Sequence, residues 1–167
     1  PIAFAGNDLP GVMLASAARS YANRFAVQPG SRAVIFGNNA DIHATADALA
    51  EAGVEIAAVV DGRQNPGATP GTHRVVHGRI KQAKGGRSVR GVELDTGDRF
   101  ACDLVCVAGG RNPAVHLSSQ LGPKPGWDDR IQSFVPGESC HGEVAAGAAD
   151  GLIATRDALA DGAEAGR

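Results

Sequence analysis

The residues best able to do chemistry in this sequence surround the turn Gly37-Asn38-Asn39, which follows the apolar run Ala33 to Phe36. Apolar residues then recur at helical spacing from Asp41 onward, and a second apolar run, Val54 to Val60, ends in Asp61. An order of strand, turn, helix and strand is a βαβ unit. Such a unit can place a dinucleotide pyrophosphate over the helix N-terminus, while an acid about 20 residues past the turn holds the ribose hydroxyls.

The turn departs from the glycine fingerprint of dinucleotide-binding folds. Asn39 stands where a second glycine lets the backbone approach phosphate, and Ile42 stands where a third glycine lets helix and strand pack closely. Asparagine tolerates the left-handed backbone region, so the turn can form, but we expect any dinucleotide to bind weakly. A carboxylate at Asp61 favours NAD over NADP, although Arg63 nearby weakens that preference. A purely structural βαβ unit stays open as the alternative.

A third apolar run, Leu104 to Ala108, is continuous, as in parallel strands that are buried on both faces, and it leads into Gly109-Gly110. A buried strand that ends in two glycines puts bare backbone at the carboxyl edge of the sheet, where open α/β sheets bind ligands. The candidate cofactor-binding residues are Gly37, Asn38, Asn39, Asp41, Asp61, Arg63, Gly109 and Gly110.

No catalytic or metal-binding residue is predicted. Cys140 and His141 are neighbours in the chain but lack other clustered ligands, which is a weak signal for nucleophilic or metal chemistry. Cys102 and Cys106 alternate through an apolar strand, which suits reduced thiols packed on one face of a core.

The elements that must position these residues indicate an α/β fold, a Rossmann-like parallel sheet with an antiparallel β-meander in 79–94. Turn-forming residues dominate 62–71, so a second crossover helix is expected to be missing or much reduced. A last helix is expected beyond Leu152. An earlier helix is predicted to begin near Pro10 and to bury a stripe at helical spacing, made of Leu14, Ala17, Ala18, Tyr21 and Phe25.

Composition bounds the class of protein. Of the 167 residues, 43% are hydrophobic and 20% are charged, which indicates a globular protein, and the net charge of -2 argues against a nucleic-acid partner. The sequence shows neither a membrane-spanning run nor a signal peptide, so a cytoplasmic location is expected.

Several motifs together resemble the pyridine-nucleotide-disulfide type of flavoprotein, in which a nicotinamide domain is inserted in a discontinuous flavin domain. Within that group the chain most resembles the α subunit of heterotetrameric sarcosine oxidase and related opine, proline and cyanide-forming dehydrogenases. The asparagine-rich turn is the most specific match. The matching stretches are 7–15, Gly37 to Asp41, 59–63, Gly109 to Pro113 and Ala146 to Gly151.

The resemblance implies a flavin-linked amine oxidase that oxidises sarcosine to glycine and forms hydrogen peroxide. It implies NAD in the α subunit, held by this fold or by an absent N-terminal fold, and FAD and FMN held with other subunits of a hetero-oligomer. The chain then reads as a middle segment in three parts. Residues 1–31 are a helical lead-in from the absent dinucleotide fold, 32–110 are the NAD-type domain with its meander, and 111–167 are a loop and a C-terminal helix that return to the flavin-type fold. A scaffold or subunit-interaction domain without nucleotide stays open.

Overall fold

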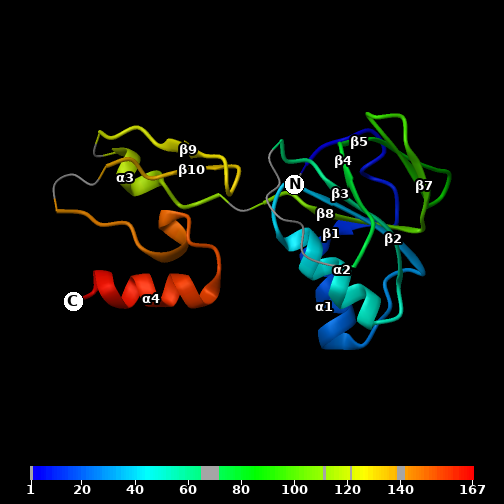
Figure 1. Ribbon diagram of the computed structural model, residues 1–167, viewed down its shortest axis with the longest axis horizontal. Coiled ribbons are helices and arrows are strands. Elements are labelled where there is room, and N and C mark those ends of the chain that lie inside the picture. The colour runs from blue at the N-terminus through cyan, green and yellow to red at the C-terminus, as the bar shows by residue number, and fades with distance from the viewer. Residues whose placement is uncertain (1, 65–71, 111, 121, 139–141) are drawn as a thin grey trace. The chain divides into compact units, whose positions relative to one another are not determined.

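The computed structural model describes residues 2–64, 72–110, 112–120, 122–138 and 142–167. The chain forms two compact units, Pro1–Gly109 and Gly110–Arg167, and each is described by itself. The larger unit contains every predicted strand of the βαβ pattern (Figure 1).

The first unit is built on a five-stranded sheet in which all neighbouring strands are parallel. Its order is β1-β8-β2-β3-β4, with β1 (Val12–Leu14), β8 (Leu104–Ala108), β2 (Arg32–Gly37), β3 (Glu55–Asp61) and β4 (Val75–His77). The predicted sheet of β2, β3 and β8 is confirmed by the parallel pairing of these strands. Apolar runs of this kind are typical of parallel strands that are buried on both faces.

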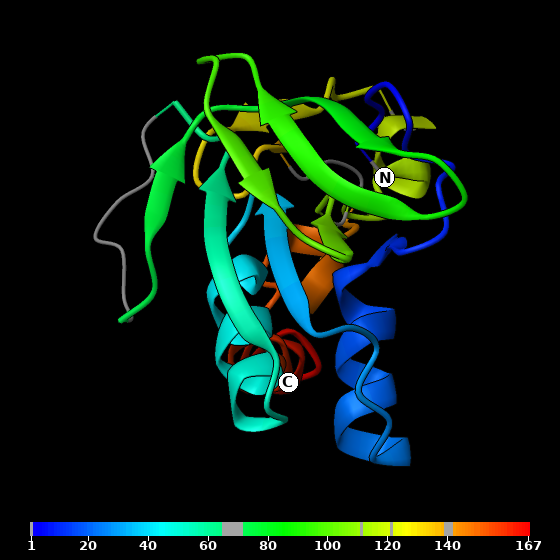
Figure 2. The ribbon, with the colours of Figure 1, turned by 90° about the vertical axis from the view of Figure 1, so that its right-hand side faces the viewer.

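Two layers cover this sheet. Helices α1 (Ala15–Phe25) and α2 (Asp41–Glu51) lie on one face, as Figure 2 shows. The antiparallel sheet of β5 (Ile80–Gly85), β6 (Val89–Leu94) and β7 (Arg99–Ala101) packs on the other and confirms the predicted meander.

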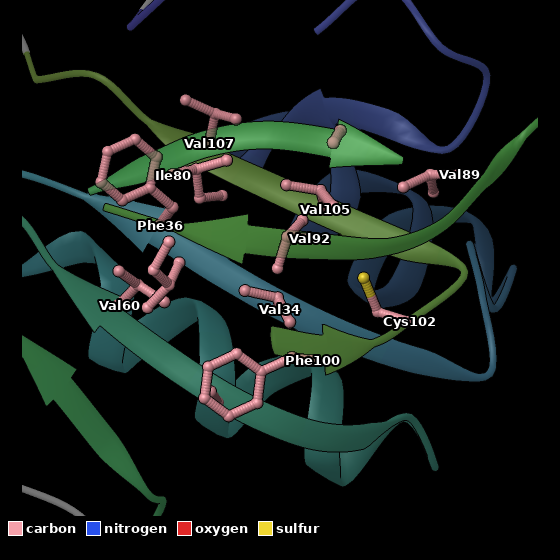
Figure 3. Packing of buried hydrophobic residues seen from close by; sticks show 13 residues of the cluster. Val34, Phe36, Val60, Ile80, Val89, Val92, Phe100, Cys102, Val105 and Val107 are labelled. Atoms are coloured by element: carbon pink, nitrogen blue, oxygen red, sulfur yellow. The ribbon is translucent and has the colours of Figure 1, made fainter. Parts of the chain in front are cut away.

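Alternate residues of each central strand therefore enter different cores. In β2, Val34 and Phe36 face the meander, whereas Ala33 and Ile35 face the helices. Figure 3 shows the meander-side core, in which Val34, Phe36 and Phe100 meet side chains of the other strands. These four β2 side chains are at most 2% exposed, so the site at the end of β2 follows a fully packed strand.

The predicted start of the first helix is wrong, and its predicted buried face is confirmed only at Ala18. Residues 12–14 pair with β8 as a short strand, and the helix begins only at Ala15. Its buried side chains are Ala15 and Ala18, whereas Tyr21 and Phe25 are 45% and 60% exposed. The cause is close packing of α1 against α2, which admits small side chains at the contact and turns the aromatic ones outward.

The expectation for the two thiols holds only in part. Cys102 and Cys106 are both free and buried, but they lie in different cores, because Cys102 precedes β8 and faces the meander while Cys106 faces the helices. Burial raises the pKa of Cys102 to about 11 and that of Cys106 to about 12. Neither thiol is a nucleophile at neutral pH.

The second unit has less regular structure. Its elements are α3 (His116–Gln120), β9 (Gly126–Asp128), β10 (Ser133–Val135), the 3₁₀ turn η1 (Gly147–Asp150) and α4 (Thr155–Ala165). The rings of Trp127 and Phe134 meet edge to face across the β9–β10 pair, with centroids 5.1 Å apart. The expected last helix is α4, which buries no side chain of its own. Most of the 62–71 segment, as well as Arg111, Cys140 and His141, lies outside the described residues.

Candidate functional site

The candidate site is the carboxyl edge of the parallel sheet, where three neighbouring strands end side by side. Gly37 at the end of β2 is in register with Asp61 of β3 on one side and with Ala108 of β8 on the other. The βαβ pattern thus brings the predicted turn and the predicted acid to adjacent positions. Open α/β sheets bind ligands at this edge.

Gly37 allows the three elements to approach one another. A Cβ added to it would lie 2.5 Å from the Ala108 carbonyl oxygen and 2.7 Å from Cγ2 of Ile42. Both distances are far shorter than a van der Waals contact, so the missing side chain is a packing requirement of the strand and helix. The single fingerprint glycine that the sequence retains is therefore needed for the fold itself.

The two asparagines close the turn with their own hydrogen bonds. Nδ2 of Asn39 donates to the Ala108 carbonyl oxygen at 2.9 Å and to Oδ1 of Asn38 at 3.2 Å. Oδ1 of Asn39 accepts from the Asp41 backbone N–H at 3.0 Å. The Asn39 side chain thus fills the space next to the turn and accepts from the Asp41 N–H. With glycine at this position, both would be available to a phosphate.

The N-terminus of α2 lies directly behind this turn and carries Asp41 as its first residue. A carboxylate in a first turn interacts favourably with the helix dipole but lowers the attraction for a second anion. Arg19 of α1 partly offsets its charge, since Nη2 lies 3.8 Å from Oδ2 of Asp41. The helix N-terminus therefore offers a phosphate less attraction than one with a neutral first turn.

Asp61 is buried and is bound by Arg63. The Arg63 backbone N–H donates to Oδ1 at 3.0 Å, Nε donates to Oδ1 and Oδ2 at 2.9 and 3.2 Å, and Nη2 donates to Oδ2 at 2.6 Å. The side chain of Asp61 is 0% exposed and that of Arg63 is 15% exposed. Both carboxylate oxygens that a ribose would use are thus engaged by a neighbour in the chain.

The pKa values of the pair reflect this contact. Burial by itself raises the pKa of the Asp61 carboxyl, but the hydrogen bonds and charge of Arg63 outweigh burial and leave the pKa below its ordinary value. Hydrogen bonding to Asp61 raises the pKa of the Arg63 guanidinium. Both groups are charged at neutral pH and form a true ion pair.

His43, the third residue of α2, is a neighbour of this pair that the sequence did not single out. It is 7% exposed, and its Nε2 has no hydrogen-bond partner within the described residues. Burial lowers its pKa, partly opposed by the negative charge of Asp61 and reinforced by Arg63. Ala40 and Ala46, three residues before and after His43, are the weak apolar signal that could have found it.

The two glycines after β8 differ in setting. Gly109 is half-buried and follows Ala108 at the edge, whereas Gly110 is exposed, has a left-handed φ of 80° and begins the second unit. The structure therefore brings Gly109 together with Gly37, Asn38, Asn39, Asp41, Asp61 and Arg63 in the first unit.

Two further properties constrain the function. Among the described residues no cluster of histidine, cysteine and carboxylate side chains could hold a metal ion. Within the same residues, no helix has the length and apolar character needed to cross a bilayer.

Sequence comparison places these elements among known proteins. The chain is 38% identical over 180 residues to the sarcosine oxidase α subunit of Corynebacterium sp. strain U-96, which covers 98% of this chain and 18% of that protein. It is 39% identical over 155 residues to the sarcosine oxidase α subunit of Rhizobium meliloti, covering 89% of this chain and 16% of the relative. The chain thus spans less than a fifth of the length of these relatives. No protein-family model matches it.

Solved structures agree on the fold. L-proline dehydrogenase from P. horikoshii superposes with a TM-score of 0.60 at 21% identity, over 89% of this chain and 27% of the other. A ferredoxin reductase from Rhodopseudomonas palustris gives a TM-score of 0.56 at 21% identity, over 74% of this chain and 35% of the other. The fold of this chain is therefore shared by segments of these two solved structures.

Proposed function

This chain is homologous to one segment of sarcosine oxidase α subunits, and on that premise we propose that it is the dinucleotide-type region of the α subunit of a flavin-linked amine oxidase. The observation that carries the proposal is identity of 37 to 39% that extends over 89 to 99% of the chain. The reaction proposed for the intact enzyme is oxidation of sarcosine to glycine with formation of hydrogen peroxide. The equivalent region of an opine, proline or cyanide-forming dehydrogenase is the neighbouring possibility.

The proposed ligand of the edge is NAD. Its pyrophosphate would lie over Gly37, Asn38 and Asn39 at the start of α2, and its adenine ribose would lie toward Asp61 and Arg63. Gly109, followed in the chain by Gly110, would lie beneath the half of NAD that is farther from the adenine ribose. The position of these residues at the ends of adjacent parallel strands supports this placement.

The donors of the turn fit a dinucleotide only in part, so we expect weak binding. Asn39 uses its amide on Ala108, Asp41 adds negative charge at the helix N-terminus, and Arg63 occupies Asp61. NAD should therefore bind this edge more weakly than it binds a turn with the complete glycine fingerprint. NAD of the intact subunit could then be held mainly by another fold of that subunit.

FAD and FMN belong to the intact complex in this proposal, and the residues described above do not form a complete site for either. Because the relatives are named as α subunits, other subunits are the proposed partners. We therefore expect the chain by itself to oxidise no sarcosine.

A scaffold function without bound nucleotide is the second candidate. It is favoured because polar side chains at the edge already have partners in the protein: Asp61 is 0% exposed and paired with Arg63, and Asn39 forms hydrogen bonds with both β8 and α2. In that case the unit would contribute packing surface to the subunit and no ligand.

Calorimetric titration with NAD, NADH, FAD and ATP separates the two. The proposal expects weak but saturable heat with NAD and NADH and none with FAD. Saturation with FAD alone would contradict the placement of a nicotinamide dinucleotide, and the absence of heat with every nucleotide would leave the scaffold function.

A further inference from the structure

Arg63 contacts Asp61 as a ligand would. Its guanidinium takes up both carboxylate oxygens through Nε and Nη2, at 2.6 to 3.2 Å, and its backbone N–H adds a further bond to Oδ1. A ribose bound at the end of the second strand of a βαβ unit would present its hydroxyl donors to those same oxygens. The guanidinium and the ribose therefore compete for one acceptor.

The carboxylate cannot easily move out to meet a ligand. The Asp61 carbonyl oxygen accepts from the Gly78 N–H at 3.1 Å, and the Gly62 N–H donates to the Gly37 carbonyl oxygen at 2.8 Å. The peptide group that follows the Asp61 side chain is therefore held from two directions, by the end of β2 and by the residue after β4. Arg63 lies two residues past the end of β3 and has a long side chain. Access to Asp61 therefore depends on where the Arg63 guanidinium lies.

We propose that Arg63 is a specificity-determining residue that competes internally with the dinucleotide, because an adenine ribose can bind Asp61 only after the guanidinium has left it. This inference rests on the proposed function of the edge and assigns a cause to its weak binding. It also makes the nucleotide preference of the edge depend on Arg63 instead of on Asp61 alone.

The preference follows from charge. While Arg63 neutralises it, Asp61 neither accepts strongly from the ribose hydroxyls nor repels a 2′-phosphate. Once the guanidinium is removed, the carboxylate can accept charge-assisted hydrogen bonds from both hydroxyls of NAD and repels the 2′-phosphate of NADP. Loss of Arg63 should therefore favour NAD selectively.

The test is calorimetric titration of the full chain with NAD and with NADP, for wild type and for Arg63→Ala. We expect Arg63→Ala to bind NAD about 10-fold to 100-fold more tightly, the equivalent of a gained charge-assisted hydrogen bond, and to bind NADP no more tightly than wild type. Arg63→Lys, which can still pair with Asp61, should gain less than about threefold.

Two controls isolate the cause. Arg90→Ala removes the same charge from an exposed position in β6 and should leave both affinities within about twofold, since exposed charges are screened. In Asp61→Asn with Arg63→Ala the NAD gain should disappear, because the acceptor is then neutral. An NAD gain that survives in this double variant would overturn the proposal.

Removal of Arg63 leaves a buried carboxylate unpaired, so circular dichroism must show that each variant is folded. If Arg63→Ala does not fold, Arg63→Gln is tested in its place, because glutamine retains an amide donor for Asp61. Arg63→Gln should still raise the ratio of NAD to NADP affinity. Unchanged NAD binding in the folded variants would refute the competition and leave the proposed function intact. No binding of NAD to wild type or to any folded variant would refute both.

Discussion

Substitution of Gly37 by alanine tests how closely β2, β8 and α2 approach at the candidate edge. The added methyl would lie 2.5 Å from the Ala108 carbonyl oxygen, 2.9 Å from the Ala108 Cβ and 2.7 Å from Cγ2 of Ile42. Two of these are atoms of a central strand that cannot rotate away. Relief requires β8 or α2 to shift.

The cost can be worked out from these contacts. Overpacking of a closed core costs about 1 to 3 kcal/mol. A displaced Ala108 carbonyl also weakens the hydrogen bonds that it accepts from the Asn38 N–H at 3.3 Å and from Nδ2 of Asn39 at 2.9 Å. Each is worth about 1 kcal/mol. We therefore expect Gly37→Ala to lower the free energy of unfolding by about 3 kcal/mol.

Urea unfolding followed by circular dichroism measures this change, and thermal unfolding should show a midpoint lowered by about 6 to 12 °C for a chain of this size. Gly86→Ala is the matched control, because a methyl there would meet nothing within 4 Å, and it should stay within about 0.5 kcal/mol of wild type. If Gly37→Ala were as stable as Gly86→Ala, the close approach described for this edge would be wrong.

Three further predictions concern the pH dependence of stability, the hydrogen bonds at the start of β2 and enzymatic activity. Burial holds the pKa of His43 below its ordinary value of 6.5, so the unfolded chain binds a proton at this residue before the folded chain does. The free energy of unfolding should therefore fall as pH drops from about 7 through 6.5 toward the folded pKa. Urea midpoints measured between pH 5 and 8 should show this slope in wild type and lose it in His43→Leu. The Asp103 carboxylate accepts from the Ser31 and Arg32 N–H groups at 2.8 to 3.0 Å. Asp103→Ala should therefore lower the free energy of unfolding by about 1 to 2 kcal/mol, and Asp103→Asn by about half of that. Equal losses for the two variants in urea unfolding would contradict a charge-assisted hydrogen bond. The purified chain should form no hydrogen peroxide from sarcosine, and turnover without added subunits would contradict its role as one region of a larger enzyme.

The strands at the centre of the fold were predictable because their sequence signal is local. Residues 33–36 and 104–108 are continuous apolar runs, and such runs have few positions other than the interior of a parallel sheet. The order of strand, turn and helix then fixes which ends share an edge, so Gly37 and Asp61 could be placed together before their contacts were known.

The first helix shows where periodicity fails. Of the predicted stripe, Ala18 is buried but Tyr21 and Phe25 are exposed, because the distance between α1 and α2 decides which side chains fit. β1 was missed since three residues carry too little pattern, and only pairing with β8 makes them a strand. Size complementarity and pairing are tertiary properties that spacing along the chain does not contain.

At the site, too, the residue types could be predicted from the sequence, whereas their tertiary contacts could not. Asp61 and Arg63 were both candidates, but their chain separation does not reveal that Asp61 is fully buried and that Arg63 engages both of its carboxylate oxygens. Likewise, Asn39 was expected to keep phosphate at a distance, and its bond to Ala108, a residue 69 positions away, depends on the register of β8 against β2. His43 was missed because its burial and its position within the electrostatic reach of Asp61 and Arg63 arise only in the folded chain.

The most direct test of the central claim maps the position of NAD by amide chemical shifts during titration of the full chain. The claim predicts that the largest shifts fall on Gly37, Asn38, Asn39 and Gly109, and that the same amides shift at lower NAD concentration in Arg63→Ala. Shifts confined to residues 112–167, or none at the Gly37 turn at saturating NAD, would contradict the assignment of this edge as the dinucleotide site.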